Sequence, residues 1–375
     1  MADGASIVGA AIQASSHYLD RDRTVAKACG LIREAGREGV DFMVFPEGYV
    51  PGHPLWFHFH PATGASSREL SLRLAKNAVS VPGPETDLLR AAAREARANV
   101  VVGICERSPT SGGTLYNSQL FIDREGEIVG VHRKLTPTRA ERLVHHGGGG
   151  SGLIVPRLDF GPASGLICGE NTNPLAMFSL LARGTLVHAM SWPDIGGKGR
   201  LDRGDRALLA GRAFAFTAKS YVINAVGVLS DEARRLLAFT EEDEAFLAQP
   251  QITGGSSIIG PAGEIIAGPV DHEERIVAAE LDLDRCAEEK LAHDFAGHYN
   301  RSDIFTLHVR MDDEPLYVEH GTPADVLRML PGEVERRPAV GSSGAAAPSV
   351  TPGSKAALHE QDGAAVALEE DHRIR

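Results

Sequence analysis

Cysteine is scarce in this chain, which has four in 375 residues: Cys29, Cys105, Cys168 and Cys286. None stands in a C-x-x-C pair or at the spacing of a zinc site, which argues against a metal centre built on thiolates. Four widely separated thiols fit a reducing compartment better than a disulfide framework, so we expect a cytoplasmic location. Free cysteine is usually a small core residue, and any one of the four needs further context before it is considered reactive.

Long apolar runs and an excess of basic residues are also missing. No stretch approaches the roughly 20 apolar residues that cross a bilayer. The formal net charge is −12, which argues against a nucleic-acid or membrane-surface partner because both require basic patches. The opening segment MADGASIVGA has no basic n-region, so we expect no signal peptide.

What the chain does contain is an alternation of β-branched runs and helical periodicity. Strands are expected at 6–14, 41–48, 99–107, 117–123, 127–133, 165–170, 185–193, 221–229 and 275–283, with a hairpin at 255–268, and helices at 23–36, 86–98, 174–183 and 207–219. This order predicts an α/β fold of mixed sheets covered by helices.

Two segments depart from this pattern. Residues 230–251 predict an exposed insertion between strands. From about residue 319 the composition becomes rich in Ala, Gly, Ser and Pro, which predicts one domain over 1–318 and a C-terminal extension over 319–375. We expect that extension to be mostly a flexible tail, with a short helix at 324–330.

Three reactive side chains interrupt apolar strand ends: Glu47 in VFPEG, Lys134 in VHRKL and Cys168 in LICGE. Taken singly, they also fit a solvated turn acid, a basic surface run and a core thiol. Together they supply what a cysteine nucleophile needs, namely a base, a cation for developing charge and a means of activating water. The combination is chemically sufficient, although chemistry alone does not single it out.

The segments FPEGYVPGHP, HRKLTPTRAERLVHHGGGGSG and CGENTNPLAMFSL closely resemble the three signature blocks of the nitrilase superfamily. LVHAMSWP, GGSSIIGPAGEIIAGP and GHYNRSDIFTL resemble further blocks of that family, so that the similarity extends from about residue 6 to 309. It implies Glu47 as general base, Lys134 as electrostatic stabiliser and Cys168 as nucleophile. It also places a second glutamate, Glu141, where it orients the lysine and the substrate.

The resemblance implies a four-layer α-β-β-α sandwich with two mixed sheets and no cofactor. It also implies assembly into a homodimer or a larger homo-oligomer or spiral. The substrate would be a small nitrile or amide. The wall of its pocket would include His53, Trp56, Gly169, Glu170, His188 and Trp192.

The long block after Lys134 and the GHYNRSD ending resemble the nitrilase branch, which implies hydrolysis of a nitrile to a carboxylic acid and ammonia. Gly169 stands where nitrilases usually have tryptophan, and His53 where they have another aromatic residue, so the substrate range is expected to differ. An amidase or a cyanide-hydrolysing enzyme with the same triad is the first alternative. A non-catalytic binding or assembly protein is the second.

Other motifs have plainer explanations. The histidines in FHFH and His145-His146 lack acidic or cysteine partners at ligand spacing, so no metal site is expected. The run Gly147 to Gly150 is not followed by the Lys-Ser/Thr of a phosphate-binding loop. No G-x-S-x-G nucleophile elbow is present.

Overall fold

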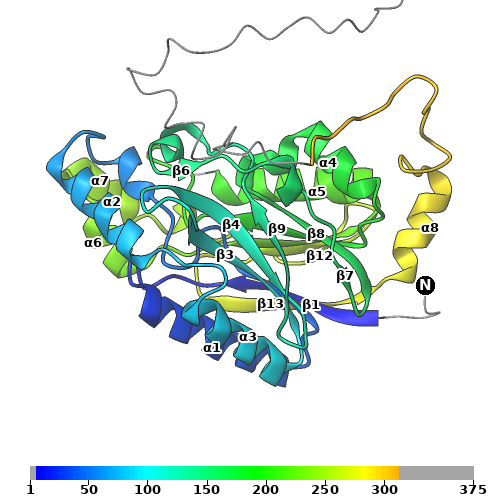
Figure 1. Cartoon of the computed structure of the whole chain (residues 1–375), viewed down its shortest axis with the longest axis horizontal. Coiled ribbons are helices and arrows are strands. Elements are labelled where there is room, and N and C mark those ends of the chain that lie inside the picture. The colour runs from blue at the N-terminus through cyan, green and yellow to red at the C-terminus, as the bar shows by residue number, and fades with distance from the viewer. Residues whose placement is uncertain (1–5, 201, 312–375) are drawn as a thin grey trace, which may run out of the picture. The chain divides into compact units, whose positions relative to one another are not determined.

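Two mixed β-sheets form the centre of the molecule (Figure 1). In order across the first sheet, the strands are β13 (Arg275–Asp282), β1 (Ser6–Gln13), β2 (Phe42–Val44), β3 (Asn99–Arg107), β4 (Leu115–Ile122) and β5 (Ile128–Arg133), with β6 (His145–His146) beside β4. The second sheet runs β12 (Ile265–Ala267), β11 (Ser257–Ile259), β10 (Tyr221–Val226), β9 (Val187–Trp192), β8 (Gly161–Ile167) and β7 (Arg157–Leu158). Both contain parallel and antiparallel neighbours.

The computed structural model describes residues 6–200 and 202–311. The expected C-terminal extension over 319–375, with its short helix, therefore lies outside the described residues. Within them no helix is long and apolar enough to cross a membrane.

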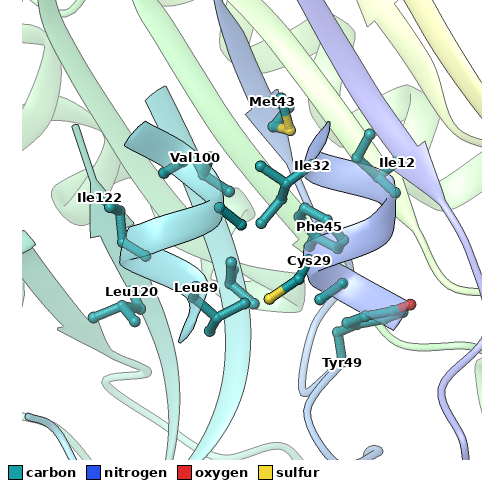
Figure 2. Packing of buried hydrophobic residues seen from close by; sticks show 14 of the residues in the cluster. Ile12, Cys29, Ile32, Met43, Phe45, Tyr49, Leu89, Val100, Leu120 and Ile122 are labelled. Carbon is teal, nitrogen blue, oxygen red and sulfur yellow. The ribbon is translucent and has the colours of Figure 1, made fainter. Parts of the chain in front are cut away.

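Helices cover the outer face of each sheet (Figure 1). On the first sheet lie α1 (Arg21–Arg37) and α3 (Pro84–Ala96), which bury residues such as Ile32 and Leu89. Figure 2 shows Ile32 and Leu89 packed with Val100 of β3 and with Phe45, which directly follows β2. On the second sheet lie α4 (Pro174–Leu181) and α5 (Arg203–Ala218).

A second core lies between the sheets, where Ala11 and Phe42 pack with Val187 and Ile223. This arrangement confirms the expected four-layer α-β-β-α sandwich.

Most of the predicted strands and helices are present, but β2 ends at Val44 and β8 at Ile167, so Glu47 and Cys168 lie outside the strands predicted over 41–48 and 165–170. Pro174 takes the first position of α4, where its missing N–H costs no hydrogen bond, and the Asn173 side chain caps the helix.

A third cluster lies at one end of the sandwich and was not foreseen. There α2 (Ala65–Asn77), α6 (Asp231–Leu237) and α7 (Glu241–Leu247) lie together around the 3₁₀ turn η1 (Leu55–His58) (Figure 1). Leu237 and Leu247 are almost completely buried in this cluster. Residues 230–251 do form an insertion between strands, β10 and β11, but the insertion is only partly exposed, because its short helices bury an apolar face. Helix α8 (Asp284–Ala292) follows β13 and was not predicted either.

Candidate active site

The three reactive residues lie directly after strands whose ends meet at one edge of the two sheets. Glu47 follows β2, Lys134 follows β5, and Cys168 opens the 3₁₀ turn η4 (Cys168–Thr172) after β8. The Glu47 backbone N–H donates to the Trp192 carbonyl at 3.1 Å. This hydrogen bond links the turn that carries Glu47, after the first sheet, to β9 of the second sheet. Rigid strands thus hold all three side chains.

Lys134 lies between two buried carboxylates. Its Nζ is 2.7 Å from Glu47 Oε1 and 2.7 Å from Glu141 Oε2. Asn117 Nδ2 donates to Oε1 of both glutamates, also at 2.7 Å. Glu141 reaches this position from the 3₁₀ turn η2 (Arg139–Leu143), where it also accepts from the Thr138 N–H at 2.8 Å and contacts His145 Nδ1 at 3.1 Å.

This environment divides the two carboxylates chemically. Burial raises the pKa of Glu47, and the nearby Lys134 ammonium only partly opposes that effect. Burial acts on Glu141 in the same sense, but Lys134 and the His145 contact hold the pKa of Glu141 well below its usual range. Burial alone would lower the pKa of Lys134, but the Glu47 carboxylate raises it. Lys134 therefore stays charged, Glu141 stays ionised, and Glu47 is the stronger base.

Cys168 is held in an unusual backbone conformation, with φ of 54° in the left-handed region. Such strain at a non-glycine residue often accompanies a functional site. The side chain is 9% exposed, and burial, reinforced by the Glu47 carboxylate, raises the pKa of the Cys168 thiol to about 11. The sulfur is therefore a thiol at rest and needs a base to become a nucleophile.

Glu47, His53 and Glu141 place ligand atoms within 4.8 Å of one another, an arrangement that could hold a cation. The Lys134 ammonium, however, already bonds both carboxylates. Burial also lowers the pKa of His53 well below its usual range, so its 3.6 Å approach to Glu47 is not an ion pair. The Lys134 ammonium thus already supplies the positive charge that a cation would bring to these two carboxylates.

A cavity of about 450 Å³ opens beside these residues. Its wall includes Glu47, Lys134, Glu141 and Cys168, together with three of the expected pocket residues, namely His53, Gly169 and Trp192. A Cβ added at Gly169 would meet no atom within 4 Å, so the glycine leaves open space beside the thiol.

The other three expected pocket residues lie behind the cavity wall. Trp56 is completely buried in the core around η1. His188 bonds Ser164 and Asn171 at 2.8 Å each and stacks on Phe214.

Glu170 has a connecting position instead. Its Oε1 accepts from the Ile167 N–H, directly before Cys168, and lies 2.5 Å from His132 Nε2, while its Oε2 accepts from the Leu135 N–H. It therefore joins the chain on both sides of Lys134 to the chain that carries Cys168.

Two further residues of the site, Asn117 and Arg203, were not singled out from the sequence, and a third, His145, was considered only as a metal ligand without an acidic partner. Asn117 bridges the two glutamates, His145 supports Glu141, and Arg203 places Nη1 4.0 Å from Cys168 Sγ. The segment after Trp192 that leads to Arg203 carries several basic residues, and this charge pattern was the available signal.

Comparison with known proteins identifies the family to which the chain is similar. The model of the carbon-nitrogen hydrolase family matches residues 9–290. A protein named nitrilase 2, from an unknown prokaryotic organism, is 38% identical over 82% of this chain and 93% of its own length. An aliphatic nitrilase of Rhodococcus rhodochrous is 33% identical over 80% of this chain and 81% of its own.

Among solved structures, a carbon-nitrogen hydrolase from Helicobacter pylori superposes with a TM-score of 0.62 over 80% of this chain and 97% of its own, at 18% identity. An amidase from Nesterenkonia sp. gives 0.55 over 77% and 95% respectively, at 16% identity. At such identities the likeness shows the shared fold.

Proposed function

Since the chain belongs to the carbon-nitrogen hydrolase family and is an enzyme that cleaves carbon–nitrogen bonds, we propose that it hydrolyses an organic nitrile to the carboxylic acid and ammonia. Relatives that are 31–38% identical over about four-fifths of the chain carry the name nitrilase, which supports this choice of substrate class. The substrate enters the 450 Å³ cavity and presents its nitrile carbon to Cys168.

In the first step Glu47 takes the proton of the Cys168 thiol as sulfur adds to the nitrile carbon. The proton passes to the nitrile nitrogen, and the product is a neutral thioimidate bound to the enzyme. Negative charge that develops on nitrogen is stabilised by the Lys134 ammonium and by the backbone N–H of Gly169. The raised pKa of Glu47 suits it both to accept the proton from sulfur and to donate it to the nitrile nitrogen.

Two water molecules complete the reaction. Glu47 activates the first, which adds to the thioimidate carbon, and the tetrahedral intermediate expels ammonia to leave a thioester. The second water attacks the thioester, releases the carboxylic acid and returns the proton to Cys168. If the tetrahedral intermediate expelled the thiol instead, the product would be the amide.

The observation that carries this proposal is the buried set of Glu47, Lys134 and Glu141 beside Cys168. The same set would serve an amidase, because an amide reaches the same thioester through loss of ammonia from its tetrahedral intermediate. Ammonia release from a panel of nitriles, the matching amides and cyanide distinguishes these reactions. Turnover of amides alone, or of cyanide alone, would remove the nitrilase assignment.

Membership of this enzyme family argues against the second alternative, a non-catalytic binding or assembly protein, so the identity of the nucleophile is what needs a test. Cys168→Ala tests the nucleophile, and Cys29→Ala is the matched control, since Cys29 is a buried thiol on the inner face of α1. We expect the first variant to lose all measurable turnover and the second to retain it. Undiminished turnover by Cys168→Ala would eliminate the mechanism.

We further propose that the enzyme is a cytoplasmic homo-oligomer. All four cysteines are free and buried, which suits a reducing compartment. The exposed apolar face of α5 supports assembly.

A further inference from the structure

The cavity is basic although the chain as a whole is acidic. Its wall includes six lysine and arginine side chains, against three carboxylates. The basic residues are Lys134, Arg139, Lys198, Arg200, Arg203 and Arg206. The proposed reaction consumes a nitrile group, which is uncharged, so the chemistry at Cys168 does not itself require this excess of positive charge.

Half of these cations are already neutralised. Lys134 bonds Glu47 and Glu141, Lys198 bonds Asp243, and Arg206 bonds Asp202. Arg139, Arg200 and Arg203 form no ion pair with any residue of 6–200 or 202–311. Positive charge in the cavity therefore exceeds what the described carboxylates neutralise.

Arg203 is the most unusual of the three, because it is only 8% exposed. Its Nη2 donates to the Ile195 carbonyl at 3.0 Å, and its guanidinium lies over the Trp192 ring at 5.2 Å. Nη1 points toward Cys168 Sγ at 4.0 Å, and Nε is buried without a hydrogen-bond partner. A buried guanidinium with an unsatisfied N–H costs free energy unless a ligand completes it.

We infer that the substrate carries a carboxylate, held by the Arg203 guanidinium, a short distance from the carbon that Cys168 attacks. A guanidinium matches the planar geometry of a carboxylate and binds it with charge-assisted hydrogen bonds. Since Nη1 is 4.0 Å from the sulfur, a carboxylate on this group must be joined to the nitrile carbon by a short chain. Arg139 and Arg200 would attract such an anion into the cavity.

This inference names the substrate class of the proposed nitrilase reaction and therefore rests on that proposal. Its test uses the full chain and matched pairs of substrates. The carboxylate-bearing nitrile is 3-cyanopropanoate, and its neutral isostere is 4-methylpentanenitrile. The corresponding pair of amides is succinamate and 4-methylpentanamide.

We expect kcat/KM to favour the carboxylate over its isostere, and Arg203→Leu to reduce that ratio about 10- to 100-fold, as loss of a charge-assisted hydrogen bond would. Arg203→Lys should retain part of the preference, since a point charge replaces the planar fork. Arg94→Leu, which removes an exposed arginine from α3, should leave the ratio unchanged. Because each ratio is internal to one variant, a partly unfolded preparation does not alter it.

Two outcomes would overturn the inference: equal rates for the anionic and neutral substrates, or an equal loss on both when Arg203 is replaced. The second would mean that Arg203 serves the thiol and not a substrate anion. Failure of the nitrilase proposal gives a different result, in which both nitriles are inert and only the amides react. The ratio between the two amides then still tests Arg203.

Discussion

Glu47 presents one carboxylate oxygen to Lys134 and Asn117 and leaves the other, Oε2, without a hydrogen-bond partner. In the proposed mechanism, that second oxygen is the one that accepts a proton from sulfur or water. Asn117 holds the first oxygen and so fixes the direction of the second. One oxygen of the carboxylate is thus held by hydrogen bonds, and the proposed proton transfer falls to the other.

Replacement of Glu47 by glutamine tests its role as the base. A base works only when it is deprotonated, so activity should fall as the pH drops through the pKa of Glu47. Burial raises that pKa, which places the acidic limb of kcat/KM above the ordinary value of 4.5. We expect Glu47→Gln to lower kcat/KM by about 10²- to 10⁴-fold and to abolish this limb. A variant with the limb intact would assign it to another group.

Gly169 controls the space beside Cys168. Because a Cβ there meets nothing within 4 Å and the residue has no positive φ, larger side chains should fold in place. We expect Gly169→Trp to fill part of the cavity and to lower kcat/KM for bulky nitriles at least about tenfold more than for small ones. Gly169→Ala is the control and should change both little. A uniform loss on all substrates would show that the tryptophan disturbs Cys168 itself.

At the scale of the elements, most strands and helices were predictable because their apolar spacing is regular, and the reactive residues lie at or just past the ends of predicted strands. The contacts among those residues were not predictable in the same way. Asn117 is 70 residues from Glu47, and Arg203 is 35 from Cys168. Such pairings depend on which strand ends meet, and no local pattern encodes that. The apolar faces of α6 and α7 were missed for a related reason, since each is only two turns long.

The close approach of β3 to the turn after β2 gives an element-scale prediction. A Cβ at Gly103 would lie 1.9 Å from the Pro46 carbonyl oxygen and 2.9 Å from the Gly48 nitrogen. Both atoms belong to the backbone that flanks Glu47, so Gly103→Ala must displace Glu47. We expect a loss of about 1–3 kcal/mol in the free energy of unfolding, together with a lower kcat.

The matched control is Gly30→Ala, within α1, where a Cβ meets nothing within 4 Å. There alanine should stabilise the protein by about 0.5–1 kcal/mol and leave kcat unchanged. Urea unfolding and steady-state kinetics measure both quantities. Full activity in Gly103→Ala would contradict this prediction, because it would mean that the backbone turn shifts while the Glu47 side chain stays in place.

At the scale of the whole molecule, the outer face of α5 is the strongest support for self-association. Leu209 and Phe216 are 71% and 50% exposed, and with Leu208 and Ala213 they line a shallow hollow of about 590 Å³. Leu209, Ala213 and Phe216 recur at helical spacing and form one continuous face. Apolar surface that is gathered in this way usually marks a contact with another protein.

The charges on this face suit a second copy of the same chain. Asp205 and Arg212 lie on either side of Leu209 along α5. Two antiparallel α5 helices, related by a two-fold axis near Leu209, would bring Asp205 of each copy toward Arg212 of the other. The carboxylate of one chain and the guanidinium of the other would then flank an apolar centre.

We therefore expect the full chain to be a dimer or larger in size-exclusion chromatography with light scattering. Leu209→Glu combined with Phe216→Glu should reduce the mass to that of the monomer, because it places repelling charges at the centre of the contact. Leu88→Glu is the matched control, since Leu88 is 57% exposed on α3, over the other sheet. An unchanged mass in the double variant, or dissociation by the control, would place the contact elsewhere on the molecule.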